Sequence, residues 1–198
     1  MPEISFDYST AQWVLSIIVG VCLTKVYNTV AHHIRHRREI IFYVPYLLLI
    51  GHIFFILIQL WFISPYTYQM VEGNRLAFLI RIIIDSIAVI VTLLALPSEQ
   101  MLSKSNLNLE TIYQDSKKDW AVIMMIWTVI GSLFGSLFNV FFGPTDQNIQ
   151  QMLVMMISAN VLTFIWIVLV LKYNNLYLHT VFQIYGISVM LLVILLSV

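Results

Sequence analysis

Long apolar runs alternate with short polar segments along the whole chain. Six runs reach the roughly 20 residues that a helix needs to cross a hydrocarbon core of about 30 Å. The runs are continuous and do not alternate apolar with polar residues, so they favour helices over the strands of a membrane barrel. We therefore predict an all-α, polytopic membrane helix bundle with transmembrane helices at about 11–31, 40–63, 76–96, 120–143, 152–171 and 176–198.

The breaks between the runs contain residues that end helices. Ser64-Pro65 is expected to end the second span, and Pro97-Ser98 the third. The longest break, residues 97–118, is too short for another domain, so we expect one transmembrane domain over residues 1–198. Within this break Asn108 can cap a short helix. Leu109, Ile112 and Tyr113 share one face of that helix, which indicates an interfacial position. That helix either lies on the lipid headgroups or acts as a docking element.

Composition narrows the class of protein. Hydrophobic residues make up 60% of the chain and charged residues 10%, against about 25% charged in a soluble domain. The net charge is zero, which argues against a nucleic-acid binder that works through bulk positive charge. The single cysteine, Cys22, excludes an intrachain disulfide. These values indicate an integral membrane protein in contact with membrane lipids and without a nucleic-acid partner.

The placement of lysine and arginine predicts the orientation. Cytoplasmic loops of membrane proteins carry an excess of these residues. In this chain the excess lies around the breaks after the first, third and fifth spans, whereas only Arg75 lies on the opposite side. Both termini are therefore expected on the non-cytoplasmic side. The eight residues on the predicted inner side are Lys25, Arg35, Arg37, Arg38, Lys104, Lys117, Lys118 and Lys172.

The third span contains an intramembrane pair of opposite charges. Arg81 and Asp85 are four residues apart and share a helix face. Ionisable side chains at this depth are costly and rarely face lipid, so this face should meet protein or water. Two interpretations remain open. The pair belongs to an ion or proton pathway or a signalling switch, or it is a structural pair that fixes helix packing.

Other spans carry uncharged polar residues at similar depths. With a rise of about 1.5 Å per residue, His52 and Asn160 fall near the bilayer middle, as Asp85 does. Gln59 and Asn139 fall nearer the outer face. These side chains predict a polar interior within the bundle or between subunits. The alternative is ordinary interhelical hydrogen bonding, worth about 0.6 kcal/mol per contact.

The fourth span carries a helix-packing motif. Gly131 and Gly135 form a Gly-x-x-x-Gly pattern, and small residues let two helix backbones approach closely in lipid. The pattern indicates packing within the chain or self-association into a homo-oligomer.

No pattern of catalytic or metal-binding residues is evident. His32 and His36 have the spacing of metal ligands on a helix, but neighbouring arginines would repel a cation. His52 and His179 differ in depth by about 13 Å, too far to share one haem. We therefore expect no cofactor, no metal and no enzymatic activity. The basic belt, defined as Arg35, Arg37 and Arg38, is expected to contact anionic headgroups or an acidic cytoplasmic partner.

The helical layout and the run Arg35-His36-Arg37-Arg38 resemble, in general plan, the membrane subunit of the bacterial Kiwa anti-phage system. The chain departs from that family in having more predicted spans. The resemblance implies an oligomeric infection or envelope-stress sensor of the bacterial inner membrane that controls a cytoplasmic effector, and it carries over no functional residue. The sequence thus predicts a membrane sensor or scaffold. The alternative is a small channel or transporter with a polar path through Arg81, Asp85 and His52.

Overall fold

The computed structural model describes residues 8–70, 75–102, 107–142 and 147–197. These residues form six long helices and one single-turn helix, which confirms the predicted all-α fold. The chain runs through α1 (Tyr8–Arg35), α2 (Val44–Met70), α3 (Arg75–Ala95), α4 (Glu99–Leu102), α5 (Leu109–Phe142), α6 (Gln147–Lys172) and α7 (Leu176–Ser197).

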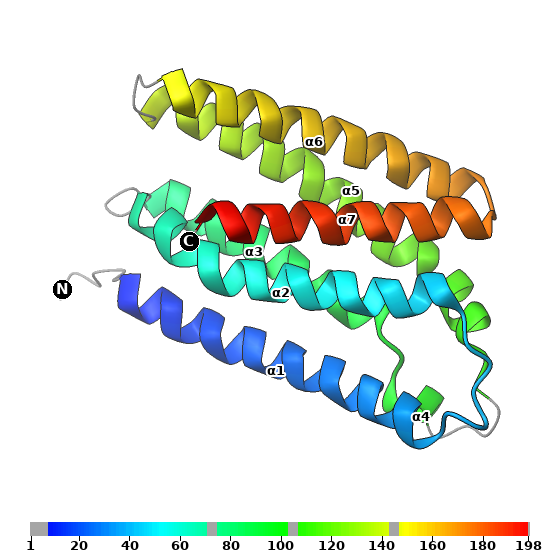
Figure 1. Cartoon of the computed structure of the whole chain (residues 1–198). Coiled ribbons are helices and arrows are strands. Elements are labelled where there is room, and N and C mark those ends of the chain that lie inside the picture. Colours follow the sequence, from blue (N-terminus) through cyan, green and yellow to red (C-terminus); the bar gives the residue numbers. More distant parts are fainter. Residues whose placement is uncertain (1–7, 71–74, 103–106, 143–146, 198) are drawn as a thin grey trace.

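Successive long helices lie beside one another and run in alternating directions (Figure 1). α2 and α7 make the most extensive helix–helix contact, although four other helices separate them along the chain. α2 also packs against α1, α3 and α5, so it forms the centre of the bundle. The start of α1 and the end of α7 lie at one end, and the α1–α2 turn, α4 and the start of α5 lie at the other (Figure 1). We call this second end the inner end.

The core is apolar, and so is much of the outer surface. α2 contributes the buried Leu49, Ile53 and Leu57, and α7 contributes the buried Phe182. On the outside, large apolar side chains are exposed on all the long helices. A soluble monomer rarely exposes apolar patches of this extent, so this surface requires lipid around it. Examples from α1, α3, α6 and α7 are Trp13, Ile17, Leu79, Ile83, Val161, Ile165 and Leu195.

Three helices are long and apolar enough to cross a membrane within the described residues. They are Gln12–Arg35, Val44–Phe62 and Phe78–Ala95. Two further apolar helices, Asn160–Lys172 and Leu176–Leu192, are shorter over the described residues. The six-span topology therefore remains a prediction.

Two predicted boundaries are wrong. The short interfacial helix expected within 97–118 is not separate, because α5 continues without a break from Leu109 to Phe142. Asn108 does cap this helix, since its Oδ1 accepts hydrogen bonds from the backbone N–H groups of Glu110 (2.9 Å) and Thr111 (3.5 Å). No glycine or proline interrupts the sequence between this cap and the apolar run, so one helix forms.

The second boundary error concerns the end of the second span. α2 continues past Ser64-Pro65 to Met70 instead of ending at residue 63. A proline inside a helix removes one backbone donor and bends the helix without necessarily ending it.

The inner end is held together by a short backbone ladder. Ile41 N–H donates to the Leu107 carbonyl (3.0 Å), and Leu109 N–H donates to the Ile41 carbonyl (3.1 Å). These bonds form an isolated parallel bridge between Ile41 and Asn108. The basic α1–α2 turn is thereby fixed to the start of α5.

Candidate functional site

A buried polar contact joins the two helices that pack most extensively. His52 of α2 and Gln183 of α7 are both almost fully buried, and His52 Nδ1 lies 2.9 Å from Gln183 Oε1. An amide oxygen accepts, so His52 donates from Nδ1 and its Nε2 carries the lone pair. This Nε2 and Gln183 Nε2 have no partner in the described part of the chain. Two polar atoms inside the bundle therefore keep unused hydrogen-bonding capacity.

The position of His52 depends on a missing side chain on α7. A Cβ atom built on Gly186 would lie 2.5 Å from His52 Nε2 and 2.7 Å from His52 Nδ1. Both distances are shorter than any Cβ contact that proteins tolerate. The imidazole ring thus occupies the space that any residue larger than glycine would fill. On its other side the ring contacts Phe182 edge-on, at 6.2 Å between centroids.

The polar residues continue from His52 toward the inner end. The Tyr113 hydroxyl of α5 lies close to the Gln183 side chain, although it forms no hydrogen bond within the described residues. The Tyr113 ring lies 5.3 Å from the ring of His179, which is fully buried on α7. His179 Nε2 donates to the backbone carbonyl of Tyr173 at 2.8 Å. His52, Gln183, Tyr113 and His179 form what we call the buried polar cluster.

The cluster ends beside a buried cation. Lys117 of α5 is 8% exposed and interacts electrostatically with His179. Burial lowers the pKa of Lys117, and the neighbouring positive charge of Lys118 lowers it further. Burial also raises the pKa of the Tyr113 phenol, which therefore stays protonated at neutral pH. The inner end of the cluster thus combines one destabilised cation with neutral donors.

Arg81 and Asp85 form an ion pair within α3. Arg81 Nη2 lies 2.8 Å from Asp85 Oδ1, and Arg81 Nε donates to Asp85 Oδ2 at 3.2 Å. The Asp85 side chain is 3% exposed and that of Arg81 is 17% exposed. The neighbouring Ala88 and Thr92 on the same face are also buried. This face is turned into the bundle, with Arg81 nearer the surface.

Of the other predicted polar residues with described side chains, neither Gln59 nor Asn160 forms a hydrogen bond with these groups. Gln59 is half-buried two helical turns along α2 from His52, and its Oε1 has no partner in the described part of the chain. Asn160 is half-buried on α6, which packs against α5 and α7. Gly131, Gly135 and Asn139 lie in the outer half of α5, and their side-chain surroundings fall outside the described residues.

The basic belt lies at the end of α1 and in the following turn. Arg35, Arg37 and Arg38 are all exposed, and none of them forms an ion pair in the part of the chain that the structure describes. A fourth basic residue has a different role. Lys25 donates to the Leu93 carbonyl (3.2 Å) in the last turn of α3, where a cation offsets the negative end of the helix dipole. The three arginines of the belt are thus available to a ligand.

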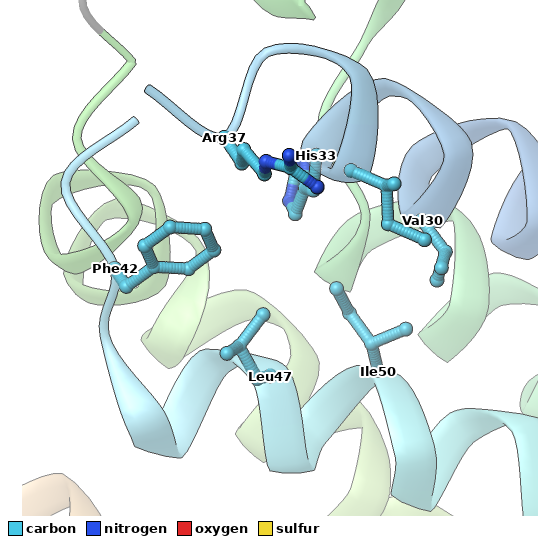
Figure 2. Close-up of a pocket in the computed structure, with 7 residues that line it drawn as sticks. Val30, His33, Arg37, Phe42, Leu47 and Ile50 are labelled. Carbon is cyan, nitrogen blue, oxygen red and sulfur yellow. The ribbon is translucent and has the colours of Figure 1, made fainter. Parts of the chain in front are cut away.

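A pocket of about 360 Å³ opens between the end of α1 and the start of α2. Figure 2 shows Arg37 reaching over this pocket, with Leu47 and Ile50 rising from α2 on the opposite side. The lining contains His33, which is 4% exposed and whose two ring nitrogens have no partner among the described residues. The remaining lining residues are Val30, Ile34 and Phe42, so an apolar cavity lies beneath one guanidinium group.

Sequence reasoning identified His52 but missed its partner. The available signals were the His179/Gln183 pair, four residues apart in an apolar helix, and Gly186 one turn further on. A helical glycine near polar residues indicates close approach of another group.

Within the described residues, no group of three or more metal-ligating side chains occurs. Comparison of the chain with models of known families, with curated proteins and with solved structures finds no match.

Proposed function

We propose that this chain is a non-enzymatic, multi-span membrane subunit that acts as a sensor or scaffold and controls a cytoplasmic partner. The proposal includes six spans, cytoplasmic placement of the inner end and both termini on the opposite side. The observation that carries it is the inner end itself. There, exposed arginines without an ion-pair partner in the described chain sit on a turn bonded to the start of α5.

The construction of the inner end supports docking of a protein. The ladder through Ile41 holds the basic turn beside the first turns of α5. Leu109 and Tyr113 are fully buried there and pack into the bundle, so the apolar face of this segment is already covered. The exposed residues in the first turns of α5, up to residue 119, are polar, and they include Glu110, Asp115 and Lys118. A rigid polar surface with a basic side suits a partner with an acidic face.

The buried polar cluster supports a signalling role. Buried polar groups with unused hydrogen-bonding capacity are costly in one packing and satisfied in another. A shift of α7 against α2 would exchange the His52–Gln183 bond for other partners and move the inner end with it. Such a shift would supply the two-state element that a sensor requires. The resemblance in general plan to the Kiwa membrane subunit supports the same choice, with oligomerisation and antiviral defence at the bacterial inner membrane.

The experiment is affinity purification of the full chain from its native membranes in mild detergent. We expect a cytoplasmic protein to co-purify, and to dissociate at high salt because exposed charge pairs are screened. The variant Arg35→Gln/Arg38→Gln should lose this protein. It keeps six of the eight inner basic residues, which are Arg37 and the five outside the belt, so the orientation should persist. The matched control is Lys172→Gln, an exposed inner residue outside the belt, which should retain the partner.

Two results would contradict the proposal. One is full retention of the partner by the double variant, which would place docking elsewhere. The other is equal loss in the Lys172→Gln control, which would indicate a general charge effect.

The burial of Asp85 and His52 favours a second candidate, a small channel or transporter with a polar path through Arg81, Asp85 and His52. Ionisable groups inside a membrane bundle often mark ion or proton routes. The test is proton or ion flux in liposomes that contain the purified chain. Flux that is lost in Asp85→Asn and in His52→Phe would favour the channel, and no flux above protein-free liposomes would reject it.

A further inference from the structure

The lining of the pocket at the inner end suits an amphipathic, anionic ligand. One polar side chain, Arg37, extends over its mouth, whereas Val30, Phe42, Leu47 and Ile50 give it apolar walls (Figure 2). Among the described residues, no acidic side chain lines it. A guanidinium group presents paired N–H donors that match the oxygens of a phosphate. The cavity therefore offers an anion site and an apolar site side by side.

The position of the pocket matches the boundary between headgroups and acyl chains. Arg37 follows the end of the apolar segment Gln12–Arg35 by two residues, which places it at the level of the headgroups. Ile50 lies six residues inside α2, which begins at Val44, so the pocket extends about 9 Å toward the membrane interior. A ligand with a charged end outside and an apolar end inside would follow this direction. A phospholipid has this form.

The unpartnered ring nitrogens of His33 are an independent indication that this pocket holds a ligand. The side chain is 4% exposed and lines the pocket, yet neither ring nitrogen has a partner among the described residues. Its ring packs against Tyr46, at 5.9 Å between centroids, which holds it in place. A neutral imidazole has one N–H donor, and buried donors are normally satisfied. One helical turn below Arg37, this donor is at the depth of a lipid's ester carbonyl groups.

We propose that the pocket between α1 and α2 binds one anionic phospholipid of the inner leaflet, with its phosphate on Arg37, an ester carbonyl on His33 and an acyl chain against Leu47 and Ile50. The site is distinct from the docking surface, because Arg35 and Arg38 do not line the pocket. The two roles divide the basic belt. Lipid at Arg37 would stiffen the turn that carries the other two arginines.

The test is native mass spectrometry of the full chain in mild detergent, titrated with phosphatidylglycerol or with phosphatidylcholine of the same acyl chains. We expect one phosphatidylglycerol to bind preferentially. Arg37→Gln should weaken this binding roughly tenfold through loss of a charge-assisted hydrogen bond. The matched control Arg38→Gln removes a neighbouring exposed arginine outside the pocket and should bind as the wild type does.

Two further variants keep the test independent of one substitution. His33→Phe keeps the ring shape and removes the donor, and Leu47→Trp fills the pocket from an already exposed position. Both should weaken phosphatidylglycerol binding. Thermal unfolding of each variant in detergent separates loss of the site from loss of the fold.

Several results would overturn the proposal. Equal binding of the two lipids would remove the anionic preference. Equal losses in Arg37→Gln and Arg38→Gln would indicate diffuse attraction to the basic belt. Full competition by soluble glycerol phosphate would identify a water-soluble phosphate compound as the ligand and reject the acyl-chain site. None of these outcomes depends on a cytoplasmic partner, so failure here leaves the proposed docking role separately testable.

Discussion

Gly186 is the residue on which the position of His52 depends most strongly. Gly186→Ala would place a methyl group 2.5 Å from His52 Nε2, which is too close for two atoms that are not bonded. The substitution should therefore displace the imidazole ring and break the His52–Gln183 bond. We expect a loss of about 1–3 kcal/mol in the free energy of unfolding, from overpacking and an unpaired polar group. Thermal unfolding in detergent measures it.

Gly51→Ala is the matched control for this substitution. It lies one residue before His52, and its added Cβ would meet Ile187 Cδ1 at 3.6 Å, an ordinary contact. Alanine also favours a helix over glycine by about 1 kcal/mol. The control should therefore be neutral or slightly stabilising. An equal loss in both variants would show that the α2–α7 contact, and not His52, is responsible.

Arg81 and Asp85 should depend on each other for their place in the bundle. Either Arg81→Gln or Asp85→Asn leaves one member of a largely buried pair without its opposite charge. In a double-mutant cycle we expect the double variant to lose about 1–3 kcal/mol less than the two single losses together. Strict additivity of the unfolding free energies would contradict a structural coupling between them.

Lys117 should make stability depend on pH in the alkaline range. Its pKa is lowered in the folded chain by burial and by Lys118, so above that lowered pKa the unfolded chain binds more protons. Stability contributed at this position therefore rises with pH as Lys117 loses its proton, until about the unfolded value of 10.5. Below the lowered pKa the cost of the buried cation is fully present.

The measurement compares the unfolding free energy of the wild type with that of Lys117→Met over this pH range. Tyrosines with a raised pKa lower the stability as pH rises, but they do so equally in the two proteins and cancel in the comparison. The variant should be more stable than the wild type at pH 7, and the difference should shrink as pH rises. Lys118→Met leaves Lys117 buried and removes only the neighbouring charge that lowers its pKa further, so it should show the same trend with a smaller amplitude. A difference that does not change with pH would contradict burial of a charged Lys117.

The helices differ in how far the sequence predicted them. The starts of the third and last predicted spans agree with α3 and α7 within one residue, because polar residues flank them closely. α5 was not foreseen as one helix, since residues 109–119 are polar outside and apolar on one face only. Their apolar face is buried by contacts distant in sequence, among them the packing of α5 on α2 and the ring contact of Tyr113 with His179 of α7, and hydropathy does not report such contacts.

The last helix should depend on its N-terminal cap. Asn175 Oδ1 accepts hydrogen bonds from the backbone N–H groups of Tyr177 (2.9 Å) and Leu178 (3.3 Å). Asn175→Ala should cost about 1 kcal/mol of unfolding free energy. The preceding Asn174 is exposed, and no hydrogen bond of its side chain is among those described. Asn174→Ala should therefore leave the melting temperature unchanged, and equal losses in the two variants would reject the capping role.

The candidate site was only partly predictable for a similar reason. The Arg81–Asp85 pair follows from spacing on one helix, and it forms. The His52–Gln183 bond joins residues 131 positions apart, and a single sequence gives no register between α2 and α7. The pocket was equally hidden, because it depends on how the α1–α2 turn folds back over both helices.

The bundle as a unit has an apolar exterior, buried polar groups and one basic end. The chain's net charge is zero, but its cations gather at the inner end. This distribution is what a protein needs that is surrounded by lipid and meets an aqueous partner on one side. The six-span topology, with that end in the cytoplasm, is therefore the statement on which the proposed function depends.

Cysteine labelling from the two sides of the membrane tests this topology. In a Cys22→Ala background, single cysteines are introduced as Arg38→Cys, Gln147→Cys and Asn174→Cys and treated with a membrane-impermeant thiol reagent in intact and in opened cells. We expect Arg38→Cys and Asn174→Cys to react only in opened cells, and Gln147→Cys to react in intact cells. Reaction of positions 147 and 174 from the same side, or of position 38 from outside, would contradict the account.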